Sequence, residues 1–545
     1  MNDIRQYILD HQLNAMRLAG RKVGADRSVD RCIQVFNPFT EEVIGTVPKA
    51  TLDEVRETFA AAHRYRPSLT RFERAAILNR AAAIINQRLD EVAQLITAEA
   101  GLCIKDALYE AGRVSDVLLF GASECLKDDG QIFSCDLTPH GKKRRVYTQR
   151  SPLLGVITAI TPFNHPMNQV AHKVVPSIAS NNRMVLKPSE KVPFSAILFA
   201  DILYEAGLPP ECLSVITGDP REIADELISN EQVDLVTFTG GVAIGKYIAG
   251  KAGYRRMVLE LGGNDPIIVM EDADLDEAST LAVQGSYKNS GQRCTAVKRM
   301  LVHSAVADEF VEQVVAKTRA WKYGDPMDQS NDMGTVIDEP AAMFFESRVN
   351  EAIGQGASLR VGNVRRGALY SPTVLDHVLP GMRVAKEETF GPVSPIIRFN
   401  SIDEAIAISN GTVYGLSSSV CSNRLDYITR FINELQVGSV NVREVPRLPA
   451  RTHPLWRHQG LRSGLQGRCA GSHQELYQPQ NLFPALALMR CWHDYLAMRF
   501  CMLAARVASW SGQPHDLQWH LLHGKQGNGS QLICNAGLQD LPPRT

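Results

Sequence analysis

The sequence shows no excess of either charge, no long apolar run and no cluster of cysteines. Its 58 Lys and Arg residues against 59 Asp and Glu residues give a formal net charge of −1, which does not predict the basic face of a nucleic-acid-binding protein. No run of about 18 apolar residues is present, so no membrane span is expected. The cysteines before residue 447 show no metal-ligand spacing and therefore predict no metal site; they lie at positions 32, 103, 125, 135, 212, 294 and 421.

These absences favour a cytoplasmic protein without membrane or nucleic-acid partners. Scattered free thiols are typical of a reducing compartment. The first 20 residues include acids and predict an amphipathic helix rather than a signal peptide. A chain of 545 residues with 44% hydrophobic and 21% charged residues is typical of a globular protein with two or three domains.

Strand and helix patterns alternate along the middle of the chain. Short apolar runs predict buried strands at 156–161, 183–187, 213–217 and 234–239. Helical patterns lie between them at 193–206 and 220–228. This alternation predicts an α/β fold with a parallel, doubly wound sheet. A helical region at 52–130 precedes it, and a second α/β unit is expected from about 264 to 440.

Two segments carry the chemistry. Cys294 follows Arg293 in a turn of small residues, and Glu260 stands in an apolar run 34 residues upstream (294 − 260). A thiolate that attacks and a carboxylate that activates water form a pair that thiol chemistry requires. A cysteine taken alone is more often a small buried hydrophobic residue.

Six motifs, including both segments, resemble the aldehyde dehydrogenase superfamily in residues and in order. They are Pro162-Phe-Asn164, Lys187-Pro-Ser-Glu190, Phe238-Thr-Gly-Gly241, Glu260-Leu-Gly-Gly263, Gly291-Gln-Arg-Cys294 and Glu388-Thr-Phe-Gly-Pro392. The resemblance runs from about residue 30 to Pro446. It implies an aldehyde dehydrogenase-like fold: a Rossmann-type NAD-binding domain, an α/β catalytic domain and a small β arm that makes a homodimer or homotetramer. The implied segments are 1–133 with 150–262, 263–440 and 134–149, respectively.

The resemblance also implies catalytic roles. Cys294 would be the nucleophile, and the Asn164 side-chain amide, with the Cys294 backbone N–H, would stabilise the oxyanion. Glu260 would be the general base that hydrolyses the thioester, which favours a non-acylating enzyme that releases a free acid. The interpretation that Asn164 is a plain turn residue, or Glu260 a capping residue, is the alternative for each.

The implied cofactor is NAD, with NADP left open. The glycines Gly240, Gly241 and Gly245 would let the pyrophosphate approach a helix N-terminus. Lys187 and Glu190 would hold the adenosine ribose, where a carboxylate disfavours a 2′-phosphate; the small Ser189 weakens that preference. Glu388 and Phe390 would hold the nicotinamide ribose and ring.

The substrate end is basic for this family. The expected substrate-binding residues are Arg113, His165, Arg293 and Arg443. Such a set suits a small anionic aldehyde, because the arginine fork matches phosphonate or phosphate oxygens. The stretches 164–168 and 287–294 resemble the branch of the family that oxidises phosphonoacetaldehyde to phosphonoacetate. The alternatives are a semialdehyde or sulfoacetaldehyde dehydrogenase, a relative that keeps only the fold, or a damaged, frameshifted relative.

The composition changes after Pro446. Residues 447–545 hold four of the five Trp and seven of the 14 His, and the family's Pro-Phe-Gly-Gly motif is missing. Codons permitted for residues 454–469, read in the +1 frame, can spell that motif and the residues that follow it. We therefore interpret 447–545 as an out-of-frame peptide without a defined fold. A genuine divergent extension is the alternative.

Overall fold

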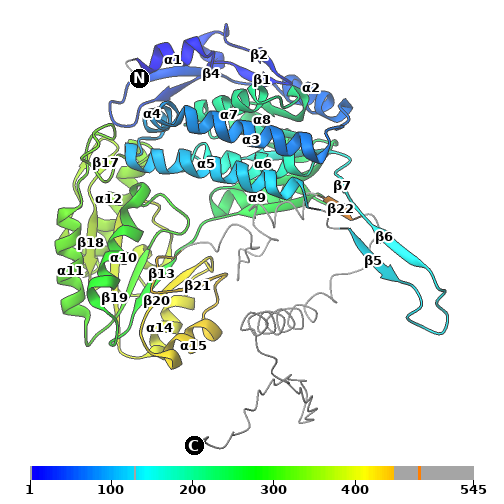
Figure 1. Ribbon diagram of the computed structural model, residues 1–545. Helices are drawn as coiled ribbons and strands as arrows, with labels where there is room; N and C mark the ends of the chain where they lie inside the picture. Colours follow the sequence, from blue (N-terminus) through cyan, green and yellow to red (C-terminus); the bar gives the residue numbers. More distant parts are fainter. Residues whose placement is uncertain (1–2, 128–129, 447–476, 480–545) are drawn as a thin grey trace, which may run out of the picture. The chain divides into compact units, whose positions relative to one another are not determined.

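A computed structural model of the protein describes residues 3–127, 130–446 and 477–479. They contain two seven-stranded sheets, each with a parallel centre and helices on both faces (Figure 1). Most of the segment interpreted as out of frame lies outside the described residues. Among those described, no helix combines the length and the apolar character that a membrane crossing needs.

The first sheet continues the strand series that the sequence predicted, and the predicted α/β fold class is confirmed. Its central strands pair in parallel, and the two N-terminal strands join antiparallel at one edge. In spatial order the strands are β12 (Arg256–Glu260), β11 (Val233–Thr239), β8 (Val156–Ile160), β9 (Met184–Lys187), β10 (Leu213–Val215), β1 (Met16–Leu18) and β2 (Arg21–Val23).

Helices cover both faces of this sheet because alternate strand residues are apolar on each side. Val185 packs into the core on one face, and its neighbours Met184 and Leu186 pack into the core on the other. One layer holds α3 (Arg71–Gln87), α4 (Leu89–Ala100), α5 (Ile104–Cys125), α6 (Asn168–Ala179) and α7 (Phe194–Glu205). The other holds α2 (Leu52–Arg64), α8 (Pro220–Ser229) and α9 (Val242–Ala252).

Local signals set the helix ends in the helical region 52–130. Thr51 and Glu54 form a capping box at the start of α2, and Thr70 and Glu73 form another at the start of α3. Helix α4 ends at Gly101, which has φ of 71° and so adopts the left-handed conformation.

The second sheet begins at residue 266, just after the first ends at residue 260. Its strands, in order, are β15 (Ser358–Val361), β18 (Thr373–Asp376), β19 (Val393–Phe399), β14 (Arg299–His303), β13 (Pro266–Val269), β20 (Ser418–Cys421) and β21 (Val440–Val442). The helices around it are α10 (Leu275–Tyr287), α11 (Ala307–Ala320), α12 (Glu339–Gly354), α13 (Arg383–Lys386), α14 (Ile402–Asn410) and α15 (Leu425–Glu434). Small two-stranded sheets pair β3 (Cys32–Phe36) with β4 (Val43–Pro48) and β16 (Arg365–Arg366) with β17 (Leu369–Tyr370).

The N-terminus departs from the sequence prediction of one amphipathic helix over 20 residues. Helix α1 spans only Ile4–Asp10, and the chain then turns into strand β1. Gln12 has φ of 49°, a left-handed conformation that stops the helix. Residues 16–18 instead form an internal strand that pairs with β10 on one side and with the edge strand β2 on the other.

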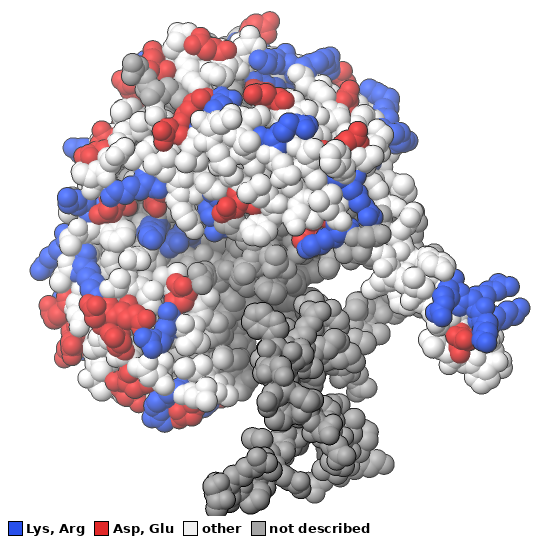
Figure 2. Space-filling model, viewed as in Figure 1, with Lys and Arg blue, Asp and Glu red and all other residues white. Residues whose placement is uncertain are grey.

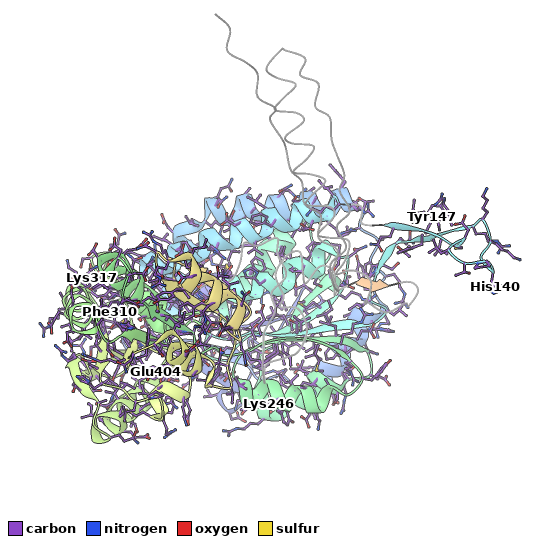
Figure 3. The ribbon with its side chains drawn as sticks, turned by 90° about the horizontal axis from the view of Figure 1, so that it is seen from below. His140, Tyr147, Lys246, Phe310, Lys317 and Glu404 are labelled. Atoms are coloured by element: carbon purple, nitrogen blue, oxygen red, sulfur yellow. The ribbon has the colours of Figure 1, made fainter. Side chains whose placement is uncertain are left out.

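A hairpin leaves the first sheet between α5 and β8. Strands β5 (Gln131–Ser134) and β6 (Arg145–Thr148) pair antiparallel, and Figure 3 shows them projecting away from the helices, with His140 near the tip. The tip carries the basic run 142–145, visible in Figure 2. Strand β7 (Arg150–Pro152) follows and pairs antiparallel with β22 (Tyr477–Pro479). For residues 477–479 the structure thus differs from the expectation of an unstructured tail.

Candidate active site

Four motif residues lie at one edge of the first sheet. Glu260 is the last residue of β12, Lys187 is the last of β9, Gly240 follows β11 and Asn164 follows β8. These four strands are neighbours and run parallel. Their carboxyl ends therefore share an edge, which is where open α/β sheets bind ligands.

The amino ends of the second sheet meet this edge. A Cβ atom on Gly263 would lie 2.5 Å from the carbonyl oxygen of Cys294, and one on Gly262 would lie 2.0 Å from the Glu388 carboxylate. Only glycine permits approaches this close. The structure thus brings together three loops that are distant in sequence: those of Glu260, Cys294 and Glu388.

The loop that presents Cys294 has an unusual backbone. Asn289, Ser290 and Gly291 have φ of 59°, 53° and 69° in succession. The Asn289 N–H donates to the Asp106 carboxylate of α5 at 2.7 Å, which helps hold this conformation. Cys294 itself is partly exposed and forms no disulfide. These three left-handed residues turn the chain tightly. Cys294 follows the turn and stays partly exposed to solvent.

Asn164 contacts the same loop and is buried. Its side-chain Nδ2 donates to the Gln292 carbonyl at 2.8 Å, and its own carbonyl accepts from the Asn289 side chain at 2.9 Å. The bond to Gln292 uses one of its two N–H groups, and the described residues offer the other no partner. The Asn164 amide thus contacts the backbone two residues before the thiol, where an oxyanion could form.

Glu260 is buried at 7% exposure and has polar neighbours. Its carboxylate accepts a hydrogen bond of 2.8 Å from the Thr239 hydroxyl. Lys173, on α6, donates to the Thr237 hydroxyl at 3.0 Å. Burial lowers the pKa of Lys173, while the charge of Glu260 acts in the opposite direction. Sequence reasoning missed Lys173; a lysine inside the apolar run 170–175 was the available signal.

The glycines of the nucleotide motif stand at the N-terminus of α9. Gly241 is the N-cap residue, and a Cβ atom there would meet nothing within 4 Å. A Cβ atom on Gly245 would lie 2.3 Å from Leu261, so this glycine lets the helix pack closely. A Cβ on Gly240 would lie 2.5 Å from the Phe238 ring. Open space before free helix N–H groups fits a pyrophosphate.

Lys187 and Glu190 form an ion pair of 3.3 Å beside this helix start. Lys187 is almost fully buried and also donates to the Pro188 carbonyl at 3.0 Å. Burial lowers the pKa of Lys187. Ser189 is half-buried between them and accepts from the Lys191 N–H at 3.3 Å. The pair offers an ammonium and a carboxylate to sugar hydroxyls.

Glu388 and Phe390 belong to the loop before β19. The Glu388 carboxylate accepts from the Gly263 N–H at 3.2 Å, and the Phe390 ring packs edge-on against Phe163, with centroids 6.0 Å apart. Lys298 lies behind this ring, its Nζ 4.6 Å from the centroid. Sequence reasoning did not single out Lys298.

Three of the four predicted substrate residues lie around α5. The His165 ring contacts the Glu110 carboxylate at 3.2 Å. Arg113 stands one turn further along α5, over the Tyr109 ring at 5.8 Å, and forms no ion pair with a described carboxylate. Arg293 donates to the Gly285 carbonyl at 2.7 Å, and burial lowers its pKa.

Arg443 has other partners in this structure, and its predicted place at the substrate end stays a prediction. It is exposed, and its guanidinium pairs with Glu277 at 2.7 Å and donates to Asn423 at 3.0 Å. The pairing arises because β21 ends at Val442 and Arg443 turns with φ of 50° toward the start of α10.

Comparisons with known proteins agree with this architecture. The profile of the aldehyde dehydrogenase family matches residues 25–478. The chain is 36% identical over 413 residues to the 3-sulfolactaldehyde dehydrogenase of Priestia aryabhattai, covering 76% of this chain and 86% of the relative. It is 36% identical over 425 residues to the sulfoacetaldehyde dehydrogenase of Neptuniibacter caesariensis, covering 77% and 92%.

A solved structure extends the likeness to three dimensions. The NADP-dependent glyceraldehyde-3-phosphate dehydrogenase of Bacillus halodurans C-125, complexed with NADP, has a TM-score of 0.81 and 33% identity. The match covers 86% of this chain and 98% of that one.

Proposed function

Because this chain belongs to the aldehyde dehydrogenase family, we propose that Cys294 carries out the oxidation of a short anionic aldehyde to its carboxylic acid. The observation that carries this proposal is the meeting of the three loops at Gly262 and Gly263. It places a partly exposed thiol, a buried carboxylate and a free amide N–H at one sheet edge.

In the proposed reaction the Cys294 thiolate attacks the aldehyde carbon. The carbonyl oxygen becomes an oxyanion, which accepts from the free N–H of Asn164 and the backbone N–H of Cys294. A bound oxidised nicotinamide would supply the hydride acceptor, and loss of hydride from the adduct carbon would leave a thioester on Cys294. Glu260 then takes a proton from water, the water oxygen attacks the thioester carbon, and the thiolate leaves. Hydrolysis gives a free acid, as expected of a non-acylating enzyme.

We propose that the cofactor is NAD or NADP, held along the edge from Lys187 to Glu388. The opening at Gly241 fits the pyrophosphate, and Lys187 with Glu190 fits the adenosine ribose. Glu388 and Phe390 would hold the nicotinamide half. The preference for NAD rests on the Glu190 carboxylate, which would repel a 2′-phosphate. The nearby Ser189 leaves room for one, so paired assays with the two nucleotides decide the preference.

The proposed substrate class rests on Arg293, which precedes Cys294, and on Arg113 of α5, the helix whose Asp106 bonds the same loop. Arg113 and Arg293 offer guanidinium groups that no described carboxylate neutralises through an ion pair, and His165 adds a third polar group. Charge-assisted contacts of this type favour a tetrahedral acid group. Both curated relatives described above are named for sulfonated aldehydes. They favour sulfonate, whereas the sequence resemblance predicted the phosphonate of phosphonoacetaldehyde; a carboxylated semialdehyde is the third candidate.

A substrate panel tests the proposal. Phosphonoacetaldehyde, sulfoacetaldehyde, succinate semialdehyde and propanal are compared with NAD and with NADP. The expected result is a kcat/KM for one of the anionic aldehydes at least about tenfold above that for propanal, which corresponds to roughly one charge-assisted contact. Cys294→Ala is the control and removes all product. Equal values for all four aldehydes would contradict an anionic substrate.

We further infer that residues 447–545 are read out of frame. The matches of 413 and 425 residues leave nearly a quarter of the 545-residue chain unaligned, although the family profile extends to residue 478. The nucleotide sequence around codon 446, from an independent clone, tests this.

We expect the +1-frame product to be an active homodimer or homotetramer joined through the arm 134–149. The 545-residue form should be aggregated and weakly active, because an unpaired hairpin edge aggregates. A well-behaved, active oligomer of the 545-residue form would show that the tail is genuine.

A further inference from the structure

Lys298 joins two of the loops that meet at the site. It directly precedes β14, and its side chain is 2% exposed. Its Nζ donates to the Gly291 carbonyl at 3.1 Å and to the Thr389 carbonyl at 3.2 Å. Gly291 belongs to the loop that presents Cys294, and Thr389 stands between Glu388 and Phe390. One ammonium thus binds the backbone of both loops.

The two loops also touch directly at the same place. A Cβ atom on Gly291 would lie 2.3 Å from the Gly391 carbonyl oxygen. On its outer side, the Phe390 loop is held by Arg348, which donates to the Glu388 carbonyl at 2.8 Å. These contacts give a shift of Phe390 or Glu388 two routes to Gly291: the backbone contact and Lys298.

The ammonium of Lys298 lies 4.6 Å from the Phe390 ring centroid, within electrostatic reach of Glu388 and Cys294. Burial lowers its pKa to about 8. A buried charge costs stability unless strong contacts offset it. Its place in the site therefore calls for a role other than stabilisation.

We propose that Lys298 is a positioning residue that couples occupation of the Glu388–Phe390 loop to the reactivity of Cys294. This proposal rests on the assignment of that loop to the nicotinamide half of the cofactor. When the loop is occupied, Lys298 and the Gly291–Gly391 contact transmit its position to the loop of Cys294. Without the ammonium, occupation of the Glu388–Phe390 loop no longer changes the reactivity of Cys294.

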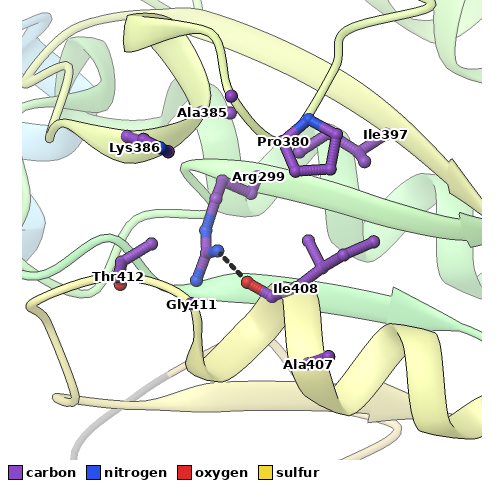
Figure 4. Close-up of a pocket in the computed structure, with 10 residues that line it drawn as sticks. Arg299, Pro380, Ala385, Lys386, Ile397, Ala407, Ile408, Gly411 and Thr412 are labelled. Atoms are coloured by element: carbon purple, nitrogen blue, oxygen red, sulfur yellow. Dashed lines mark hydrogen bonds between the residues drawn. The ribbon is translucent and has the colours of Figure 1, made fainter.

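Arg299 provides a matched control because it is the next residue and is also a buried cation. Its guanidinium donates to the carbonyls of Asn264, Ile408 and Ser409, and not to either loop. Figure 4 shows it in the wall of a cavity of about 340 Å³, with its bond to Ile408. Removing Arg299 tests the loss of a buried cation from the same strand without breaking the link between the loops.

The test measures alkylation of Cys294 by iodoacetamide, followed by peptide mass spectrometry, with and without saturating NAD or NADP. It uses the soluble one of the 545-residue and +1-frame products, both of which contain residues 3–446. The readout is the ratio of the two rates. For the unaltered chain we expect a ratio that differs from one by at least about fivefold, the lower end of typical coupling between sites. In Lys298→Met the ratio should approach one, while nucleotide still binds, as shown by quenching of tryptophan fluorescence. In Lys298→Arg the logarithm of the ratio should be at least half of its value in the unaltered chain. In Arg299→Met the ratio should equal that of the unaltered chain.

The outcomes separate the proposals. A ratio near one in the unaltered chain with nucleotide bound, or a ratio unchanged in Lys298→Met, overturns the coupling. A ratio lost equally in Arg299→Met shows that both residues act only on structure. Should Lys298→Met not fold, Lys298→Gln retains an amide donor, removes the charge and decides the same comparison. Absence of any nucleotide binding contradicts the proposed function instead.

Discussion

The cofactor side and the substrate side of the site are built differently. On the proposed cofactor side, Lys187 ends β9, Gly241 caps the start of α9 and Gly245 lies inside that helix. On the proposed substrate side, the residues are long side chains from separate elements, with Arg113 on α5 and Arg293 before the thiol. The first arrangement depends on the backbone and suits a ligand common to a whole family. The second depends on side chains and can change with the substrate.

The largest expected effect lies at the junction of the two sides. Asn164→Ala removes the amide donor beside Cys294 and should lower kcat by about 10²- to 10³-fold, as the loss of one oxyanion donor does. Nucleotide affinity should stay within about twofold of the unaltered protein, because Asn164 lies off the cofactor side. Stopped-flow NADH formation and a nucleotide titration measure the two effects. If nucleotide affinity falls as much as kcat, Asn164 supports the fold of both sides and the comparison fails.

The next effect concerns the arginines. Arg113→Ala and Arg293→Ala should each raise KM for an anionic aldehyde by about 10- to 150-fold, the equivalent of a charge-assisted contact of about 1.5–3 kcal/mol. KM for propanal should change little, because it carries no charge. Arg443→Ala is the matched control, since that arginine pairs with Glu277 instead. Equal losses for propanal would show that the two arginines only maintain structure.

A pair of glycines sharpens the description of the cofactor side. Gly241→Ala adds a Cβ atom in open space and should weaken nucleotide binding with little change in stability. Gly245→Ala adds one 2.3 Å from Leu261 and should lower the free energy of unfolding by about 1 kcal/mol, as overpacking does. Nucleotide titration and urea denaturation measure both variants. The opposite pattern would mean that the ligand does not approach the N-terminus of α9 at Gly241.

The smallest expected effect is a pH dependence of stability that arises at Glu99. Glu99 accepts from the N–H groups of Phe194 and Ser195, at the start of the helix that follows the Lys187 loop. Burial raises its pKa from 4.5 to about 7. The folded protein therefore binds an extra proton in that window, and this carboxyl's contribution to stability is lost as the pH rises through about 7. Between pH 5 and 8 the free energy of unfolding, measured by urea denaturation, should decline less steeply in Glu99→Gln than in the unaltered protein. Parallel curves for the two proteins would exclude Glu99 as the cause.

The comparison also explains how far the sequence could predict the molecule. Strands β8, β9 and β11 were predictable because each is a short apolar run followed by a motif, and their parallel order aligns those motifs at one edge. The place of Lys173 near Glu260 was not predictable, because Lys173 belongs to α6 and comes within electrostatic reach of that carboxylate only in the folded chain. The contacts of Arg443 were unpredictable for the same reason: its direction depends on φ at one residue and on Glu277, 166 positions away. Side chains that converge from distant elements leave no local pattern.

The central claim, that Cys294 forms a thioester which Glu260 then hydrolyses, is tested most directly by Glu260→Gln. Rapid mixing with NAD and the preferred anionic aldehyde should give a burst of one NADH per active site, followed by a steady rate at least about 10²-fold below that of the unaltered protein, as the loss of general base catalysis predicts. Mass spectrometry of the quenched protein should find the acyl group on Cys294. Burst and steady-state rates that fall by the same factor, with no acyl group on Cys294, would contradict the account.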